Sequence, residues 1–145
     1  MRILIINGPN LNLLGIRAKD LYGSLTLNDL NALIEKEYPE IQFEFFQSNI
    51  EGEIITKIQQ SNELNSALII NPGGYAHTSV AIKDALEECK IIKIEVHLSH
   101  LVNRESYRQN LLTAASCDGY ISGFKEKSYF AAVYLVLAMV KLNNI

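Results

Sequence analysis

The segment RILIINGPNLNLLGIRAKDLYGSLTL, residues 2–27, sets the fold of the chain. Its short apolar run at 2–6 is typical of a central strand that is covered on both faces. The stretch that follows, as far as Gly23, is much longer than the roughly 4–6 residues that usually connect elements in compact domains. In this stretch Arg17 and Tyr22 lie between Gly15 and Gly23, two glycines that can act as hinges. We therefore expect a lid or a substrate clamp after the first strand, with a long solvated linker as the alternative.

The composition indicates a single globular domain over residues 1–145. Apolar residues make up 48% of the chain and charged residues 20%, which is enough apolar material for one ordinary core. The net charge of −3 argues against nucleic acid or an anionic membrane surface as a partner. We expect a small molecule as the ligand.

The cysteines and the apolar runs indicate the compartment. Cys89 and Cys117 lie in apolar patterns without the spacing of zinc or redox motifs, so we expect two buried free thiols in a reducing compartment. The first residues lack the apolar stretch of a secretion signal. The longest apolar run, residues 130–140, is shorter than the about 20 residues that span a bilayer. These features predict a soluble, cytoplasmic protein.

Strand patterns alternate with amphipathic helix patterns along the whole chain. Strands are expected at 2–6, 41–47, 67–71, 91–96 and 119–123, and helices at 26–38, 52–65, 79–88 and 129–142. The third helix is expected to bury Val80, Ala81, Ala85 and Leu86. This alternation predicts a parallel sheet with right-handed crossovers and helices on both faces. The expected fold class is α/β, a single five-stranded flavodoxin-like sheet of order 2-1-3-4-5.

The last predicted helix, residues 129–142, is apolar on almost every side. One sheet face rarely covers so apolar a helix, so we expect part of it to contact another subunit. A deeply buried core helix is the alternative.

In a sheet of this kind, ligands bind beyond the carboxyl ends of the strands, near the switch point between strands 1 and 3. Three predicted loops leave those ends, at residues 7–23, 71–78 and 97–108. They are also the stretches richest in Asn, His, Arg, Tyr and Ser. This coincidence predicts an active site at that edge of the sheet.

The known cofactor motifs are missing from the sequence. No G-x-G-x-x-G follows the first strand, no Walker A motif occurs, and Asn7 and Asn10 stand where a phosphoacceptor domain needs acidic residues. Glu95, His97 and His100 are close in sequence, but they lack the spacing of a zinc site. We therefore expect chemistry without a metal or a cofactor.

Tyr22 and Arg17 share the first loop, and Arg104 and Arg108 follow the fourth strand. A free phenol is protonated at neutral pH and is a poor base. One guanidinium at about 4 Å favours the phenolate by roughly 4 kcal/mol at an effective dielectric of about 20, before desolvation takes part of this back. A tyrosinate held by arginine could then remove a proton next to a carbonyl. The alternative for Tyr22 alone is a loop aromatic that packs on the surface.

His97 ends the fourth strand, with Glu95 two residues earlier on the same face. The carboxylate could fix the imidazole tautomer and prepare it as a proton donor. The amides of Leu98 and Ser99 could form a nest for a carboxylate. The Asn71–Gly74 turn, which includes Gly73, lets the backbone approach a ligand closely, and the helix N-terminus that follows favours an anion.

Four stretches closely resemble the type II 3-dehydroquinate dehydratases. They are NGPNLNLLGIR with LYG within 7–23, FFQSNIEGEII at 45–55, NPGGYAHTSVAIKDAL at 71–86, and EVHLSHLVNRESYR at 95–108. The resemblance implies an enzyme of the shikimate pathway, active in aromatic amino acid biosynthesis. The reaction would be a cofactor-free dehydration of 3-dehydroquinate to 3-dehydroshikimate, by anti elimination through an enolate or enol.

The resemblance also implies a role for individual residues. Tyr22 matches the catalytic base, Arg17 the arginine that activates it, and His97 the general acid. Asn10 matches the asparagine that stabilises the intermediate together with a bound water. The substrate-binding positions are Asn71, Gly73, His77, Leu98, Ser99 and Arg108, together with Asp84, which would reach the site from a neighbouring subunit. Members of the family form trimers that assemble into dodecamers, so we expect a homo-oligomer, most simply a dodecamer.

The chain departs from the family pattern in three places. Ala18-Lys19 replaces an acidic residue and a proline, His100 replaces an asparagine, and GFKEKSY at 123–129 replaces a glycine-rich GxGxxGY. We expect the last change to lie away from the chemistry and to affect packing or assembly more than turnover.

Two other functions are compatible with the fold. An inactive binding or assembly module would account for two of the departures from the family pattern, at Ala18-Lys19 in the predicted lid and at residues 123–129 near the end of the chain. A flavin-binding electron carrier would be yellow, and the missing phosphate loop argues against it. Ligand binding without turnover, unaffected by Tyr22→Phe, would favour the first of these.

Overall fold

Five parallel strands form one sheet in the computed structural model, which describes residues 1–143. The strands are β1 (Arg2–Asn7), β2 (Gln42–Gln47), β3 (Ala67–Asn71), β4 (Ile92–His97) and β5 (Gly119–Ser122). Their order is β2-β1-β3-β4-β5, which confirms the predicted flavodoxin-like topology.

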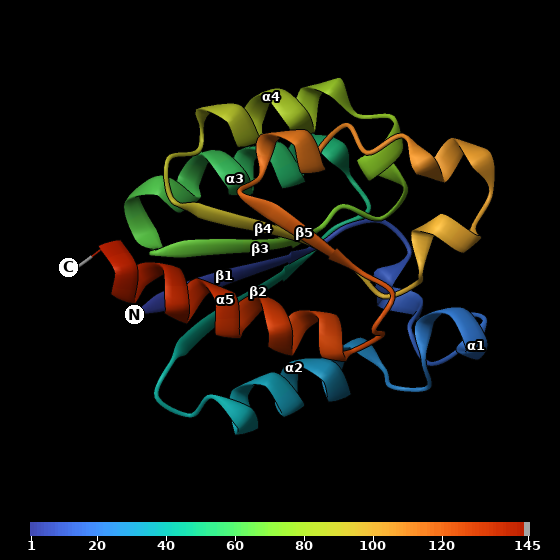
Figure 1. Ribbon diagram of the computed structural model, residues 1–145, viewed down its shortest axis with the longest axis horizontal. Coiled ribbons are helices and arrows are strands. Elements are labelled where there is room, and N and C mark those ends of the chain that lie inside the picture. Colours follow the sequence, from blue (N-terminus) through green and yellow to red (C-terminus); the bar gives the residue numbers. More distant parts are fainter. Residues whose placement is uncertain (144–145) are drawn as a thin grey trace.

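Helices cover both faces of this sheet (Figure 1). On one face lie α3 (Glu51–Leu64) and α4 (Val80–Glu88), and on the other lie α2 (Leu27–Glu37) and α5 (Lys127–Asn143). The short helix α1 (Lys19–Tyr22) lies apart from both layers, beyond the carboxyl ends of the strands (Figure 1). The loops that the sequence assigned to the site therefore share one edge of the sheet.

Alternate side chains of β1 enter two separate apolar layers, as a strand covered on both faces requires. Ile3 and Ile5 join the core formed with α2 and α5, whereas Leu4 and Ile6 join the core formed with α3 and α4. All four are fully buried. Burial of each such side chain contributes about 1.5–3 kcal/mol, so β1 stabilises the packing of both layers.

Side-chain caps start two of the helices. The sequence predicts a capping box of Thr26 with Asp29 for α2, and either Thr78 or Ser79 as the cap of α4; the structure has Ser79. Thr26 Oγ1 accepts a hydrogen bond from Asp29 N, and Asp29 Oδ2 accepts one from Thr26 N, both over 3.1 Å. This capping box starts α2. The hydroxyl of Ser79 accepts from Ile82 N and starts α4.

The predicted buried face of α4 was partly wrong. Val80 is 57% exposed and Ala81 is exposed as well, whereas Ile82 is fully buried with Ala85 and Leu86. With Ser79 as the cap, the helical period directs residues 82, 85, 86 and 89 toward the sheet and residues 80 and 81 toward solvent.

Helix α5 buries one side and exposes another. Tyr129, Ala132, Val133 and Val136 are fully buried, but Tyr134 is 66% exposed and Leu135 41% exposed. A core helix buried on all sides is therefore wrong, and contact of this face with a second subunit stays a prediction.

The two thiols differ in environment. Cys89 is buried, while Cys117 is partly buried, and both are free. Burial raises the pKa of the Cys117 thiol, so that it is held in the unreactive protonated form. Within residues 1–143, no helix is long and apolar enough to cross a membrane.

Gly8 provides a test of how closely the loops after β1 and β3 approach each other. A Cβ at this position would lie 2.5 Å from the carbonyl oxygen of Pro72, and Gly8 N donates to Asn71 O over 2.8 Å. We predict that Gly8→Ala lowers the free energy of unfolding by about 2 kcal/mol, measured by urea unfolding. Gly52→Ala is the control: nothing lies within 4 Å of its Cβ, and alanine in a helix should raise stability by up to about 1 kcal/mol. Equal unfolding midpoints for the two variants would contradict the close approach.

Candidate active site

A cleft opens at the carboxyl ends of β1, β3 and β4, where the topology predicted it. Every site residue inferred from the sequence lines this cleft except Asp84: the predicted residues in its wall are Asn10, Arg17, Tyr22, Asn71, Gly73, His77, His97, Leu98, Ser99 and Arg108. Asp84 lies on the exposed side of α4. Its predicted role depends on a neighbouring subunit and stays a prediction.

The phenol of Tyr22 lies between two arginines. Arg17 Nη2 donates to its hydroxyl oxygen over 3.0 Å, and Arg104 Nη1 does so over 3.2 Å. The Arg17 guanidinium also stacks on the ring, 4.0 Å from its centroid. These contacts hold the Tyr22 hydroxyl in the wall of the cleft, and its role as a base stays a prediction.

The stretch between Asn7 and Gly23 is not the structureless loop that its length suggested. It contains a 3-10 helix, Leu11–Leu13, and the single turn α1. In this turn the amide of Tyr22 donates to Ala18 O over 3.0 Å. The turn thus fixes the direction in which Tyr22 leaves the backbone.

Arg104 was named among the candidate arginines for Tyr22, but the family resemblance gave it no role. Besides Tyr22, its Nη1 reaches Ser99 Oγ over 2.9 Å, and its Nε pairs with Glu105 over 3.3 Å. It therefore links the loop after β4 to α1, which are far apart in sequence. The only signal in the sequence was its place in the predicted 97–108 loop beside Arg108.

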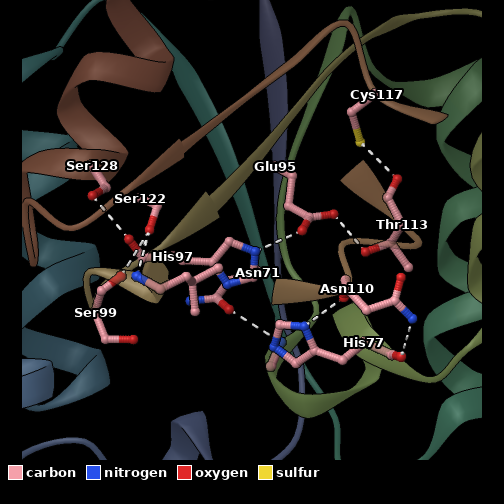
Figure 2. Close-up of polar contacts among 12 residues, drawn as sticks. Asn71, His77, Glu95, His97, Ser99, Asn110, Thr113, Cys117, Ser122 and Ser128 are labelled. Atoms are coloured by element: carbon pink, nitrogen blue, oxygen red, sulfur yellow. Dashed lines mark hydrogen bonds and ion pairs between the residues drawn. The ribbon is translucent and has the colours of Figure 1, made fainter. Parts of the chain in front are cut away.

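A buried carboxylate holds the imidazole of His97 (Figure 2). His97 Nε2 lies 2.6 Å from Glu95 Oε1, and Thr113 Oγ1 donates to Glu95 Oε2 over 2.6 Å. Glu95 and Thr113 are fully buried. With Nε2–H donated to the carboxylate, Nδ1 is the ring nitrogen left for a ligand. The carboxylate thus fixes the orientation of the ring, and the role of His97 as the acid stays a prediction.

His77 lies beside this pair. Its ring is 6.2 Å from that of His97 and nearly parallel to it, and its Nδ1 lies 2.8 Å from the carbonyl oxygen of Asn110. Because a carbonyl oxygen only accepts, Nδ1 carries the hydrogen and Nε2 is left as an acceptor. Burial lowers the pKa of His77, and the charges of His97 and Arg108 lower it further. The neutral ring can accept a hydrogen bond from a ligand hydroxyl.

The loops after β1 and β3 approach each other closely at the cleft, because two of their residues adopt left-handed backbone conformations. Asn10 is in the left-handed region with φ 68°, and Gly73 has φ 61°. A Cβ on Gly73 would lie 2.9 Å from Pro9 O, so only glycine fits here. The amide of Gly73 donates to Asn71 Oδ1 over 3.1 Å, which closes the turn after β3.

Residues 123–129, which depart from the family's glycine-rich pattern, hold the Leu98–Ser99 turn. The expectation that this segment lies away from the predicted site was wrong. Lys125 N donates to Leu98 O over 2.9 Å, and Ser128 Oγ donates to His97 O over 3.1 Å (Figure 2). Lys125 and Ser128 occupy two of the glycine positions of the family pattern. Lys125 keeps the left-handed backbone, with φ 49°, that glycine adopts most easily. The tail thus touches the catalytic segment and does not lie away from it.

Among the described residues, no group of three His, Cys, Asp or Glu side chains is arranged to hold a metal ion. The permanently charged side chains that line the cleft are the guanidiniums of Arg17, Arg104 and Arg108. This balance favours an anionic ligand.

The fold and the cleft define a flavodoxin-like α/β protein whose site is built for acid–base chemistry on an anionic small molecule. Residues 1–137 match the family model described as "Dehydroquinase class II", and the chain belongs to this family.

Relatives and solved structures agree with this assignment. The chain is 46% identical to the 3-dehydroquinate dehydratase of Clostridium botulinum, over 99% of this chain and 96% of the relative. It is 51% identical to that of Caldicellulosiruptor saccharolyticus, over 92% and 94%. The crystal structure of the type II dehydroquinase from Butyrivibrio crossotus superposes with a TM-score of 0.91 at 44% identity, covering 94% of this chain and 97% of that one.

The environment of His77 leads to a prediction about pH. We expect an NMR titration of the histidine side chains to give a pKa for His77 below its ordinary 6.5, because burial disfavours the imidazolium. The unfolded chain then binds this proton more tightly, so the stability contributed by neutral His77 is present above about pH 6.5 and is lost as the pH falls through the lower value. His77→Gln identifies the signal by its loss. A midpoint at or above 6.5 would show that the ring is hydrated.

Proposed function

We propose that the protein is a 3-dehydroquinate dehydratase of the shikimate pathway, which converts 3-dehydroquinate to 3-dehydroshikimate by anti elimination. The observation that carries the proposal is that Tyr22 and His97 line one cleft, the first beside positive charges and the second beside a carboxylate. Two guanidiniums hold the Tyr22 phenol, and a buried carboxylate holds the His97 imidazole. An elimination needs a base for one proton and an acid for the leaving group, and these two groups supply both.

In the first step, the Tyr22 phenolate takes the proton from C2 of the substrate. The electron pair of that C–H bond moves toward the neighbouring carbonyl and forms an enolate, or an enol after protonation. Arg17 and Arg104 favour the phenolate before the transfer. Asn10, together with a bound water, stabilises the charge on the enolate oxygen.

In the second step, the C1–O bond breaks and the hydroxyl leaves as water with the proton from His97 Nδ1. The enolate electrons form the new double bond, so one molecule of water is the only other product. Glu95 stabilises the imidazolium before the transfer and orients the ring throughout. The substrate carboxylate binds at the Leu98–Ser99 turn, and Asn71, Gly73, His77 and Arg108 hold the rest of the ring.

We also infer the setting in which this site works. The protein is a cytoplasmic homo-oligomer, most simply a dodecamer built from trimers, in which Asp84 of one subunit reaches the cleft of the next. Support comes from the family membership and from the exposed apolar side chains Tyr134 and Leu135 of α5. The inactive-module alternative has no support in the cleft, whose lining includes Arg17, Tyr22 and His97.

The proposal is tested by mixing the purified protein with 3-dehydroquinate and following the conjugated enone absorbance of the product. We expect turnover that persists in EDTA and a fall in kcat of about 10²–10⁴ for Tyr22→Phe, which removes the base but keeps the ring. Tyr120→Phe, a loss of the same hydroxyl at an exposed residue of β5 that does not line the cleft, should leave kcat unchanged. The proposal fails if the wild type forms no product, and the role of Tyr22 fails if both variants are equally active.

A further inference from the structure

We propose that Tyr129, a residue of α5 that lies outside the cleft, is a positioning residue that holds the Asn71 side chain toward the substrate. The proposal deepens the dehydratase function and rests on it for its kinetic test. The sequence pointed to Tyr129 only as the last residue of an altered glycine-rich motif.

The hydroxyl of Tyr129 joins the ends of two neighbouring strands. It donates to Asn7 Oδ1 over 2.6 Å, and Asn71 Nδ2 donates to it over 3.0 Å. Asn7 ends β1 and Asn71 ends β3, and the two are partners in the parallel register. One hydroxyl from a helix thus connects both strands at the switch point where the ligand binds.

The donors and acceptors in this network fix the orientation of the Asn71 amide. A tyrosine hydroxyl has one hydrogen, which goes to Asn7, so it can only accept from Asn71. The amide nitrogen of Asn71 must therefore face Tyr129, and its Oδ1 accepts from the amide of Gly73 over 3.1 Å. One N–H of Asn71 remains. Since Asn71 lines the cleft, this N–H is available as a donor to a substrate oxygen.

Burial makes this hydroxyl hard to replace by water. Tyr129 is fully buried, and Asn7 and Asn71 are 1% and 3% exposed. Burial raises the pKa of Tyr129, which keeps the hydroxyl protonated and able to donate to Asn7. In apolar surroundings an amide that loses its partner reorients or leaves a polar group unpaired. Tyr129→Phe would fill the same space and remove only this partner.

A second tyrosine on the same side of the sheet supplies a matched control. Tyr38 OH donates to the carbonyl oxygen of Phe130 over 3.0 Å, so it also bonds to α5, but it does not line the cleft. Tyr38→Phe removes one hydroxyl and one hydrogen bond to the same helix. A role in stability alone predicts similar kinetic effects for Tyr38→Phe and Tyr129→Phe.

The kinetic test measures kcat/KM for 3-dehydroquinate in the wild type, Tyr129→Phe and Tyr38→Phe, together with their thermal midpoints. We expect at least a tenfold fall for Tyr129→Phe and less than a twofold change for Tyr38→Phe. In an Asn71→Ala background, Tyr129→Phe should change kcat/KM by less than twofold, because it acts through Asn71. Equal losses for the two tyrosine variants, or additive losses with Asn71→Ala, would overturn the proposal.

A measurement without substrate separates this inference from the dehydratase function. We expect the side-chain amide protons of Asn71, assigned in NMR spectra through Asn71→Ala, to exchange slowly in the wild type and fast in Tyr129→Phe. Unchanged exchange would refute the positioning role even in an active enzyme. Protected exchange in a protein that forms no product would support the positioning role while the dehydratase proposal fails.

Discussion

The site depends on the parallel pairing of β1 with β3, which sets Asn7 opposite Asn71. Because β4 pairs with β3 in the same direction, His97 and Glu95 reach the same edge of the sheet. Three loops that are far apart in sequence therefore leave the sheet side by side. A slip of one residue in β1 would move its apolar side chains to the wrong faces, and the two apolar layers around β1 prevent it.

The two reactive groups of the cleft are supported by charges of opposite sign. Arginines surround the phenol oxygen of Tyr22, and a buried glutamate faces the imidazole of His97. Cations beside a phenol and a carboxylate beside an imidazole are the surroundings that the proposed base and the proposed acid require. The fold separates these surroundings, because the arginines come from loops and Glu95 from inside the sheet.

Most of this arrangement could be predicted from the sequence, since its signals are local. Apolar runs and caps gave the strands and helices, and their alternation gave the sheet order. The pairing of Glu95 with His97 followed from the two-residue period of a strand. The motif at 71–78 indicated the close approach of the backbone that Gly73 makes possible.

The remaining features depend on contacts between distant segments. Arg104 reaches Tyr22 across 82 positions and Tyr129 reaches Asn7 across 122, and no periodicity encodes either contact. The role of Ser128 was missed for the same reason, since the carbonyl of His97 becomes its partner only in the folded chain. The error at Val80 and Ala81 arose at a helix start, where the cap residue decides which side faces the core.

The central claim is that Tyr22 and His97 act on one small cyclic keto-acid from opposite sides. A crystal structure with 3-dehydroshikimate bound tests it most directly. The claim predicts the ligand carboxylate at the Leu98–Ser99 turn, the Tyr22 oxygen facing C2 and His97 Nδ1 facing C1 from the other side of the ring. A ligand bound away from Tyr22, or with both residues on one face of its ring, would contradict it.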